Sequence, residues 1–100
     1  MISLVTPLKA QKKLADNVRE RRLSMELTQE GLALRSSVPL PTLRKFEQKG
    51  IISLEAFLKI LLVVGGLEEI IEATKPKKVT FSSIDEVLKE TSTRKRGRRK

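Results

Sequence analysis

The sequence predicts an all-α domain of five short helices, followed by a short β-strand and a basic tail. Apolar residues recur at helical intervals through most of the first 74 residues. Glycines, prolines and capping residues divide this stretch into five segments. We therefore expect three regions: a folded domain at 1–74, a strand and a short helix at 75–93, and a basic tail at 94–100.

The first helix is expected over residues 8–24, directly after Pro7. Charged residues surround its apolar positions, which is typical of an amphipathic helix. The apolar residues expected to face the core are Leu8, Leu14, Val18 and Leu23.

The second helix should begin after Thr28, a good N-cap residue, and end near Ser36. The third is expected over residues 39–48, with Pro39 and Pro41 in its first turn. The first four N–H groups of a helix have no partner within it, so neither proline removes a helical hydrogen bond. Pro41 suits the first helical position, and we therefore expect an intact helix.

Ser53 is expected to cap a fourth helix over residues 54–64, whose large apolar side chains suit a central place in the core. Gly65 and Gly66 should end it, and a fifth helix follows at 67–73. This last helix carries an acidic patch that is either a solvated surface or a contact for a basic partner: Glu68, Glu69 and Glu72.

The segment after the fifth helix changes character. Residues 79–81 favour β-structure, but so short a strand needs a partner. We expect Val79 and Phe81 to pair with their copies across a dimer, while an extended linker is an equal alternative. Ser83 and Glu86 then have capping-box spacing, which predicts a further short helix.

The charge and the missing residue types limit the possible functions. The chain has 100 residues and a net charge of +9, of which the tail at 94–100 contributes six charges. Such a tail is either solvated or adds salt-dependent contacts to nucleic-acid phosphates. There is no cysteine or histidine, so the usual general base, thiolate nucleophile and zinc ligands are missing. We predict that the protein is not an enzyme and uses no cofactor or metal.

The size of the chain and its longest apolar run bear on its oligomeric state and its cellular location. A chain of 100 residues buries only a modest core, so a homodimer is expected. The apolar run at 60–64 is too short to span a bilayer, and the N-terminus has no signal-peptide pattern. We expect no membrane association and a cytoplasmic location.

Two short helices joined by a three- or four-residue turn, within a small five-helix domain, predict a helix-turn-helix. Ten residues of this region follow the sequence pattern of a known helix-turn-helix family without a gap: Arg22, Leu27, Thr28, Gln29, Leu32, Ala33, Val38, Leu43, Phe46 and Glu47. With them, residues 14–66 resemble the Cro/phage-repressor (XRE) family, which implies a lambda-repressor-like fold that binds double-stranded operator DNA. The chain departs from the family at Glu26 and Ser37, where the family often has glycine in a left-handed conformation, so we expect slightly strained or altered turns.

The resemblance also implies roles for individual residues. Gln29 would bind a DNA phosphate at the start of the second helix. Leu40 and Pro41 occupy base-reading positions but cannot hydrogen-bond, so we expect them to pack against thymine methyl groups. The expected DNA-binding residues are Thr28, Gln29, Leu40, Pro41, Thr42, Arg44, Lys45 and Lys49. Alternatively, Leu40 is only a hydrophobic staple, and half-site spacing and DNA bending supply the specificity.

Arg22 and Glu47 look like the family's ion pair between the first and third helices. The alternative is an exposed surface pair, whose removal would cost little stability.

The segment 46–55, "FEQKGIISLE", has a shorter break after Glu47 than typical phage repressors and resembles HipB-like antitoxins. This resemblance implies a homodimer that represses its own operon in the bacterial nucleoid and binds a HipA-like kinase toxin. The alternative is a stand-alone repressor without a toxin partner. An RNA-binding or architectural protein is disfavoured because the chain has only three aromatic residues, all phenylalanines at core-like positions.

Overall fold

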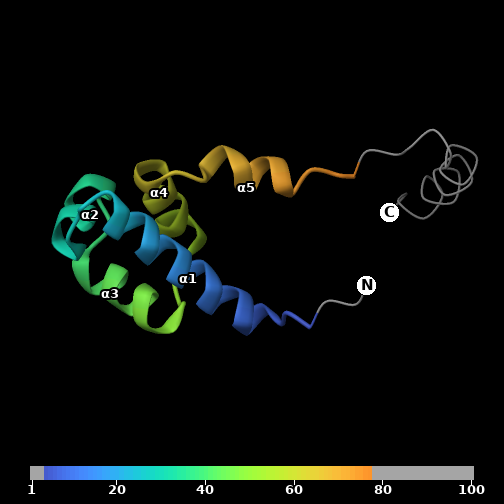
Figure 1. The fold of residues 1–100 in the computed structure, drawn as a ribbon, viewed down its shortest axis with the longest axis horizontal. Helices are drawn as coiled ribbons and strands as arrows, with labels where there is room; N and C mark the ends of the chain where they lie inside the picture. Colours follow the sequence, from blue (N-terminus) through green and yellow to red (C-terminus); the bar gives the residue numbers. More distant parts are fainter. Residues whose placement is uncertain (1–3, 78–100) are drawn as a thin grey trace, which may run out of the picture.

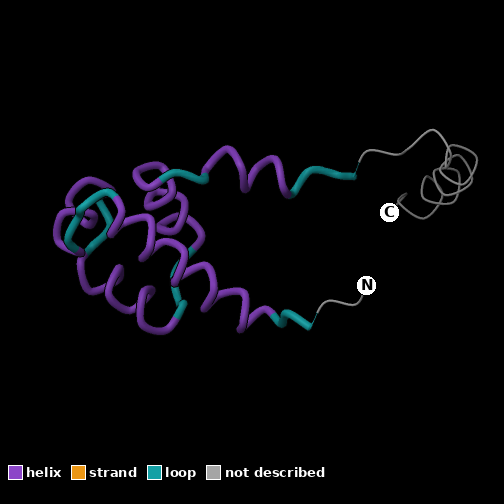
Figure 2. The backbone as a smooth tube through the Cα atoms, in the orientation of Figure 1, coloured by secondary structure: helices purple, strands orange, loops and turns teal. Residues whose placement is uncertain are grey.

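The structure is a computed structural model that describes residues 4–77. These residues form five helices: α1 (Pro7–Ser24), α2 (Gln29–Ser36), α3 (Leu40–Lys49), α4 (Leu54–Val64) and α5 (Leu67–Ala73). No strand occurs within residues 4–77 (Figure 2). The prediction of an all-α chain with five helices is confirmed for this part. The predicted strand contacts at Val79 and Phe81, the short helix after them and the basic tail lie outside the described residues.

The long helix α1 runs through the middle of the domain. It contacts α3 on one side and α4 on the other, while α2 packs against both α3 and α4 (Figure 1). The last helix, α5, contacts α4 and reaches away from the other helices (Figure 1). The amino end of α1 and the carboxyl end of α5 consequently lie on the same side of the domain, opposite α2.

The core lies where α1, α2, α3 and α4 meet. Phe46, Leu32, Leu43 and Ile60 are its largest fully buried side chains. Phe46 of α3 and Phe57 of α4 pack edge to face, with ring centroids 5.7 Å apart. The fourth helix contributes more buried residues than any other in the described chain, as its apolar sequence predicts: Phe57, Ile60, Leu61 and Val64.

The predicted apolar face of α1 is largely wrong. Leu8, Leu14 and Leu23 are 65%, 41% and 50% exposed, and only Val18 of the four expected residues is buried. The buried residues of α1 are Ala15, Val18 and Arg22. These positions are spaced at three and four residues, so they form one face, but an alanine and an arginine carry little signal in a search for apolar periodicity.

Most helix ends lie where the capping residues and glycines of the sequence predict them. The side chains of Thr28 and Ser53 cap α2 and α4, accepting hydrogen bonds from the N–H of Gly31 (2.9 Å) and of Ala56 (3.2 Å). The third helix starts one residue later than expected, at Leu40, so Pro41 is its second residue rather than its first. Because the second N–H is also unpartnered in a helix, Pro41 still removes no hydrogen bond.

Gly50 ends α3 at a point where α1 passes very close. Its φ of +74° lies in the left-handed region, and its carbonyl accepts a hydrogen bond from Gln11 Nε2 at 3.0 Å. A Cβ atom at this position would lie 2.9 Å from the backbone carbonyl carbon of Gln11. Only glycine therefore satisfies both the turn and the close approach of α1.

Replacing Gly50 by alanine should lower the free energy of unfolding by more than about 1 kcal/mol, because the side chain is strained by the positive φ and collides with backbone atoms. Urea denaturation followed by circular dichroism measures this loss. Ser37→Gly is the matched control, since Ser37 is an exposed left-handed residue after α2, and that variant should be at least as stable as the wild type. Equal stabilities of Gly50→Ala and wild type would contradict the close packing of α1 on this turn.

Candidate nucleic-acid interface

The connection between α2 and α3 is a tight turn of residues 37–39. Ser37 adopts φ 60° and ψ 29°, and Val38, only 2% exposed, fixes the turn to the core. The Val38 N–H donates to the Ala33 carbonyl (3.2 Å) and to Ser36 Oγ (3.3 Å). Glu26, in the turn before α2, has φ 57°. Both residues that stand where glycine was expected therefore take the left-handed conformation, at a cost of roughly 1–2 kcal/mol each.

A buried polar network joins α1, α2 and α3. Arg22 donates from Nε to Glu47 Oε2 (2.8 Å) and from Nη2 to Glu47 Oε1 (3.0 Å). Its Nη1 donates to the carbonyl of Leu27 at 2.8 Å. Gln29 Nε2 also donates to Glu47 Oε1, at 3.1 Å. The carboxylate of Glu47 thus accepts hydrogen bonds from two other helices, and the guanidinium also holds the turn that precedes α2.

The burial of this network decides between the two interpretations of the ion pair. The side chains of Arg22 and Glu47 are only 8% and 3% exposed. The pair is therefore a buried, two-pronged ion pair, and the alternative of an exposed surface pair is wrong. No buried side-chain nitrogen or oxygen within residues 4–77 lacks a hydrogen-bond partner, so the desolvation of these charges is compensated.

The network and the core together hold one side of α3 and leave the other side in solvent. Leu43, Phe46 and the side chain of Glu47 are buried. The opposite face is exposed and follows the spacing i, i+3, i+4, i+7: Pro41, Arg44, Lys45 and Gln48. Lys49 is exposed in the last turn. We call the surface formed by Pro41, Arg44, Lys45 and Gln48 the α3 face. It carries two cationic side chains and the amide of Gln48.

Leu40 and Thr42 are less accessible than the rest of the expected contact residues. Both are half-buried, and Leu40 packs against the core. This packing supports the staple interpretation of Leu40, since a side chain engaged with the core has less surface to offer a base. Pro41 is exposed at the start of the α3 face and remains accessible to a ligand.

The start of α2 offers fewer free donors than expected. The N–H of Gly31 is taken by Thr28 Oγ1, and Gln29 is half-buried with one amide N–H on Glu47. A primary amide has two N–H donors, so Gln29 can bind Glu47 and an anion at the same time. Gln29 therefore links the buried network to the end of the helix at which a phosphate would lie.

Two charged contacts modify the surface around the α3 face. Arg44 Nη2 lies 3.3 Å from Glu30 Oε2, but both side chains are more than half exposed, so this pair is weak and easily exchanged for another anion. Lys12 of α1 donates from Nζ to the carbonyl of Gln48 at 2.9 Å. No local pattern in the sequence indicates this long-range contact. Gln48, in contrast, shares the helical spacing of Pro41 and Arg44. This spacing could have placed it on the α3 face, but it was not among the expected DNA-binding residues.

Two further features are absent from the described part of the chain. Residues 4–77 include no group of three or more histidine, cysteine, aspartate or glutamate side chains that could hold a metal ion. Over the same range, none of the helices combines the length and the hydropathy of a membrane span.

A double-mutant cycle should show that Arg22 and Glu47 act as a unit. Arg22→Met or Glu47→Leu alone leaves one buried charge without its partner, and each should cost roughly 3–5 kcal/mol of unfolding free energy. The double variant should lose clearly less than the sum, because no unpaired charge remains. Urea denaturation of the four proteins gives the coupling. Additive losses would contradict a direct buried pair.

The chain was also compared with models of protein families, with curated proteins and with solved structures. None of these comparisons found a match.

Proposed function

We propose that the protein is a helix-turn-helix repressor of the lambda-repressor type, which binds operator DNA as a homodimer and serves as the antitoxin of a HipA-like kinase. In this proposal α3 enters the major groove and presents the α3 face to the bases and phosphates. The protein then acts in the bacterial cytoplasm, at the nucleoid, and binds no membrane.

The observation that carries DNA binding is the division of α3 into an anchored and an exposed side. The buried pair of Arg22 and Glu47 holds one side, while Arg44 and Lys45 extend into solvent from the other. Cationic side chains on a rigid helix can contact phosphates and base edges without first paying the entropy of ordering the backbone. The weak contact of Arg44 with Glu30 leaves the guanidinium available for guanine or phosphate.

The antitoxin part of the proposal rests on the sequence resemblance at residues 46–55. The acidic patch of Glu68, Glu69 and Glu72 is exposed on α5, well away from the α3 face (Figure 1). A kinase with a basic surface could therefore bind α5 while α3 remains on DNA. A stand-alone repressor would use the same α3 face and leave the acidic patch in solvent.

Arg44→Ala and Lys45→Ala should weaken DNA binding by different routes. Loss of a base contact should cost about 1–3 kcal/mol and relax the preference at one position, whereas loss of a phosphate contact should lower the salt slope by about one. Fluorescence anisotropy, at several salt concentrations, with a duplex selected by the wild-type protein from a random library gives both quantities. Lys75→Ala is the matched control, since Lys75 is exposed beyond α5 and its ammonium group pairs with Glu72 of the same end of the domain. Unchanged affinity and preference in both α3 variants would refute the proposed reading of DNA.

The partner is tested by purifying the tagged chain from its native host at its natural level and identifying companions by mass spectrometry. We expect a kinase-like protein in near-equal amount. Replacing Glu68, Glu69 and Glu72 by glutamine should release this partner and keep the preference for the operator sequence, because these residues lie on α5 and not on the α3 face (Figure 1). Recovery of the chain with only itself and DNA would favour the stand-alone repressor.

A further inference from the structure

The amino-terminal half of α1 carries a cluster of three lysines. Lys9, Lys12 and Lys13 are all exposed, and the first acidic residue of the helix, Asp16, comes after them. Their spacing of three and four residues places them on one face of α1. We call Lys9, Lys12 and Lys13 the α1 lysines.

This cluster is unfavourable for the helix that carries it. Lys9 lies in the first turn of α1, where the positive end of the helix dipole disfavours a cation. Like charges three and four residues apart repel each other, so Lys12 and Lys13 add to the cost of Lys9. Neither Lys9 nor Lys13 forms an ion pair within residues 4–77 that would offset this cost. A bound polyanion would remove both unfavourable terms.

The α1 lysines are joined to the carboxyl end of α3. Lys12 Nζ donates to the carbonyl of Gln48 at 2.9 Å, and Gln11 Nε2 donates to the carbonyl of Gly50 at 3.0 Å. The last carbonyl groups of a helix have no partner within it and favour a cation, so Lys12 stabilises this end of α3. The close approach of Gly50 to the backbone of Gln11 fixes the distance between the two helices at this point.

These contacts place the α1 lysines beside the α3 face. Gln48, whose carbonyl binds Lys12, belongs to that face, and the next residue, Lys49, is exposed. The two helices pack against each other along this end of the domain (Figure 1). Cationic side chains therefore continue from Arg44 and Lys45 past the end of α3 and onto the first turns of α1.

We propose that the α1 lysines bind the phosphates of the DNA strand that passes the carboxyl end of α3. This inference rests on the DNA binding in the proposed function and adds a second contact surface, on a different helix, that reads no bases. Lysines bind the closely spaced phosphates of a duplex without regard to sequence. An ammonium group has three donors, so Lys12 can hold Gln48 and a phosphate at the same time.

Salt-dependent DNA binding of the full chain tests this surface. Lys9→Gln/Lys13→Gln removes two of the cations and keeps the contact of Lys12 with α3. The slope of log affinity against log salt concentration should become shallower by about two, and binding at low salt should weaken by about 10-fold or more. Anisotropy should show the same loss on the duplex selected by the wild-type protein and on a random duplex, because phosphate contacts carry no sequence information.

Lys59→Gln/Lys75→Gln is the matched control. It removes the same charge from α4 and from the end of α5, where both lysines are exposed, and it should leave the salt slope unchanged. Urea denaturation separates binding from a structural role. Because Lys9→Gln/Lys13→Gln removes repulsion within α1, its unfolding midpoint should be equal to that of the wild type or higher.

Three results would overturn the proposal. The first is a salt slope of Lys9→Gln/Lys13→Gln equal to that of the control on both duplexes. The second is a lower unfolding midpoint that accompanies the loss of binding, which would assign these lysines to the fold. The third is loss of a co-purifying protein with unchanged DNA binding, which would show that the lysines bind an acidic protein surface.

The random duplex separates this inference from the proposed function. A wild-type chain that binds both duplexes alike, with a slope that falls in Lys9→Gln/Lys13→Gln, refutes the operator-specific repressor and supports the lysine surface. A wild-type chain that prefers the selected duplex, with a slope that this variant leaves unchanged, refutes the lysine surface alone.

Discussion

The buried contact between Arg22 and Glu47 is the constraint on which the arrangement of the first three helices depends. The guanidinium of Arg22 reaches from α1 to Glu47 of α3 and to the turn before α2. The carboxylate of Glu47 also accepts a hydrogen bond from Gln29 of α2. Three backbone segments are thus fixed through two side chains with directional bonds. Apolar packing alone sets distances between helices less strictly, because it has no preferred direction. The position of α3 relative to α1 therefore follows from hydrogen-bond geometry as much as from the core.

Burying the charges of Arg22 and Glu47 costs desolvation free energy, which is a large term for a small domain. Replacing a buried ion pair by apolar residues of similar volume is often neutral or stabilising in other proteins, so the network need not increase stability. What it does supply is a fixed orientation for α3, whose opposite face carries Arg44 and Lys45. Rigid placement of contact side chains favours recognition, because little freedom is lost on binding. The network is thus better explained by the proposed contact of α3 with DNA than by the stability of the fold.

The sequence predicts the parts of this structure that depend on local chemistry. Caps such as Thr28 and Ser53 act within one turn, and the left-handed residues Glu26 and Ser37 occupy positions that a family pattern marks for glycine. The apolar periodicity of α1 missed its buried face because Arg22 is buried for its partner in α3; the family pattern indicated this pair, but no property of α1 alone does. Contacts such as Lys12 with Gln48 depend on how two distant helices pack, and single-residue propensities contain no such information.

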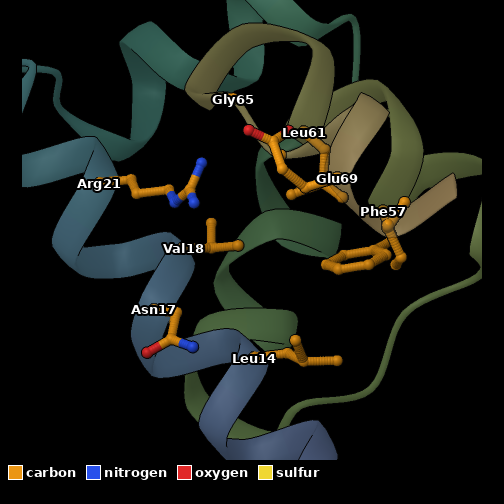
Figure 3. Close-up of a pocket in the computed structure, with 10 residues that line it drawn as sticks. Leu14, Asn17, Val18, Arg21, Phe57, Leu61, Gly65 and Glu69 are labelled. Atoms are coloured by element: carbon orange, nitrogen blue, oxygen red, sulfur yellow. The ribbon is translucent and has the colours of Figure 1, made fainter. Parts of the chain in front are cut away.

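The helix α1 has to satisfy two different neighbours, α3 on one side and α4 on the other. One of its faces carries Arg22 toward α3, and an adjoining face carries Leu14 and Arg21 into a hollow that residues of α4 and α5 also line (Figure 3). Arg22 takes a place on the core-facing side of α1, and Leu14 is left partly exposed beside the hollow. The burial of one charged side chain for its partner in α3 therefore explains why the apolar residues of α1 do not all face the core.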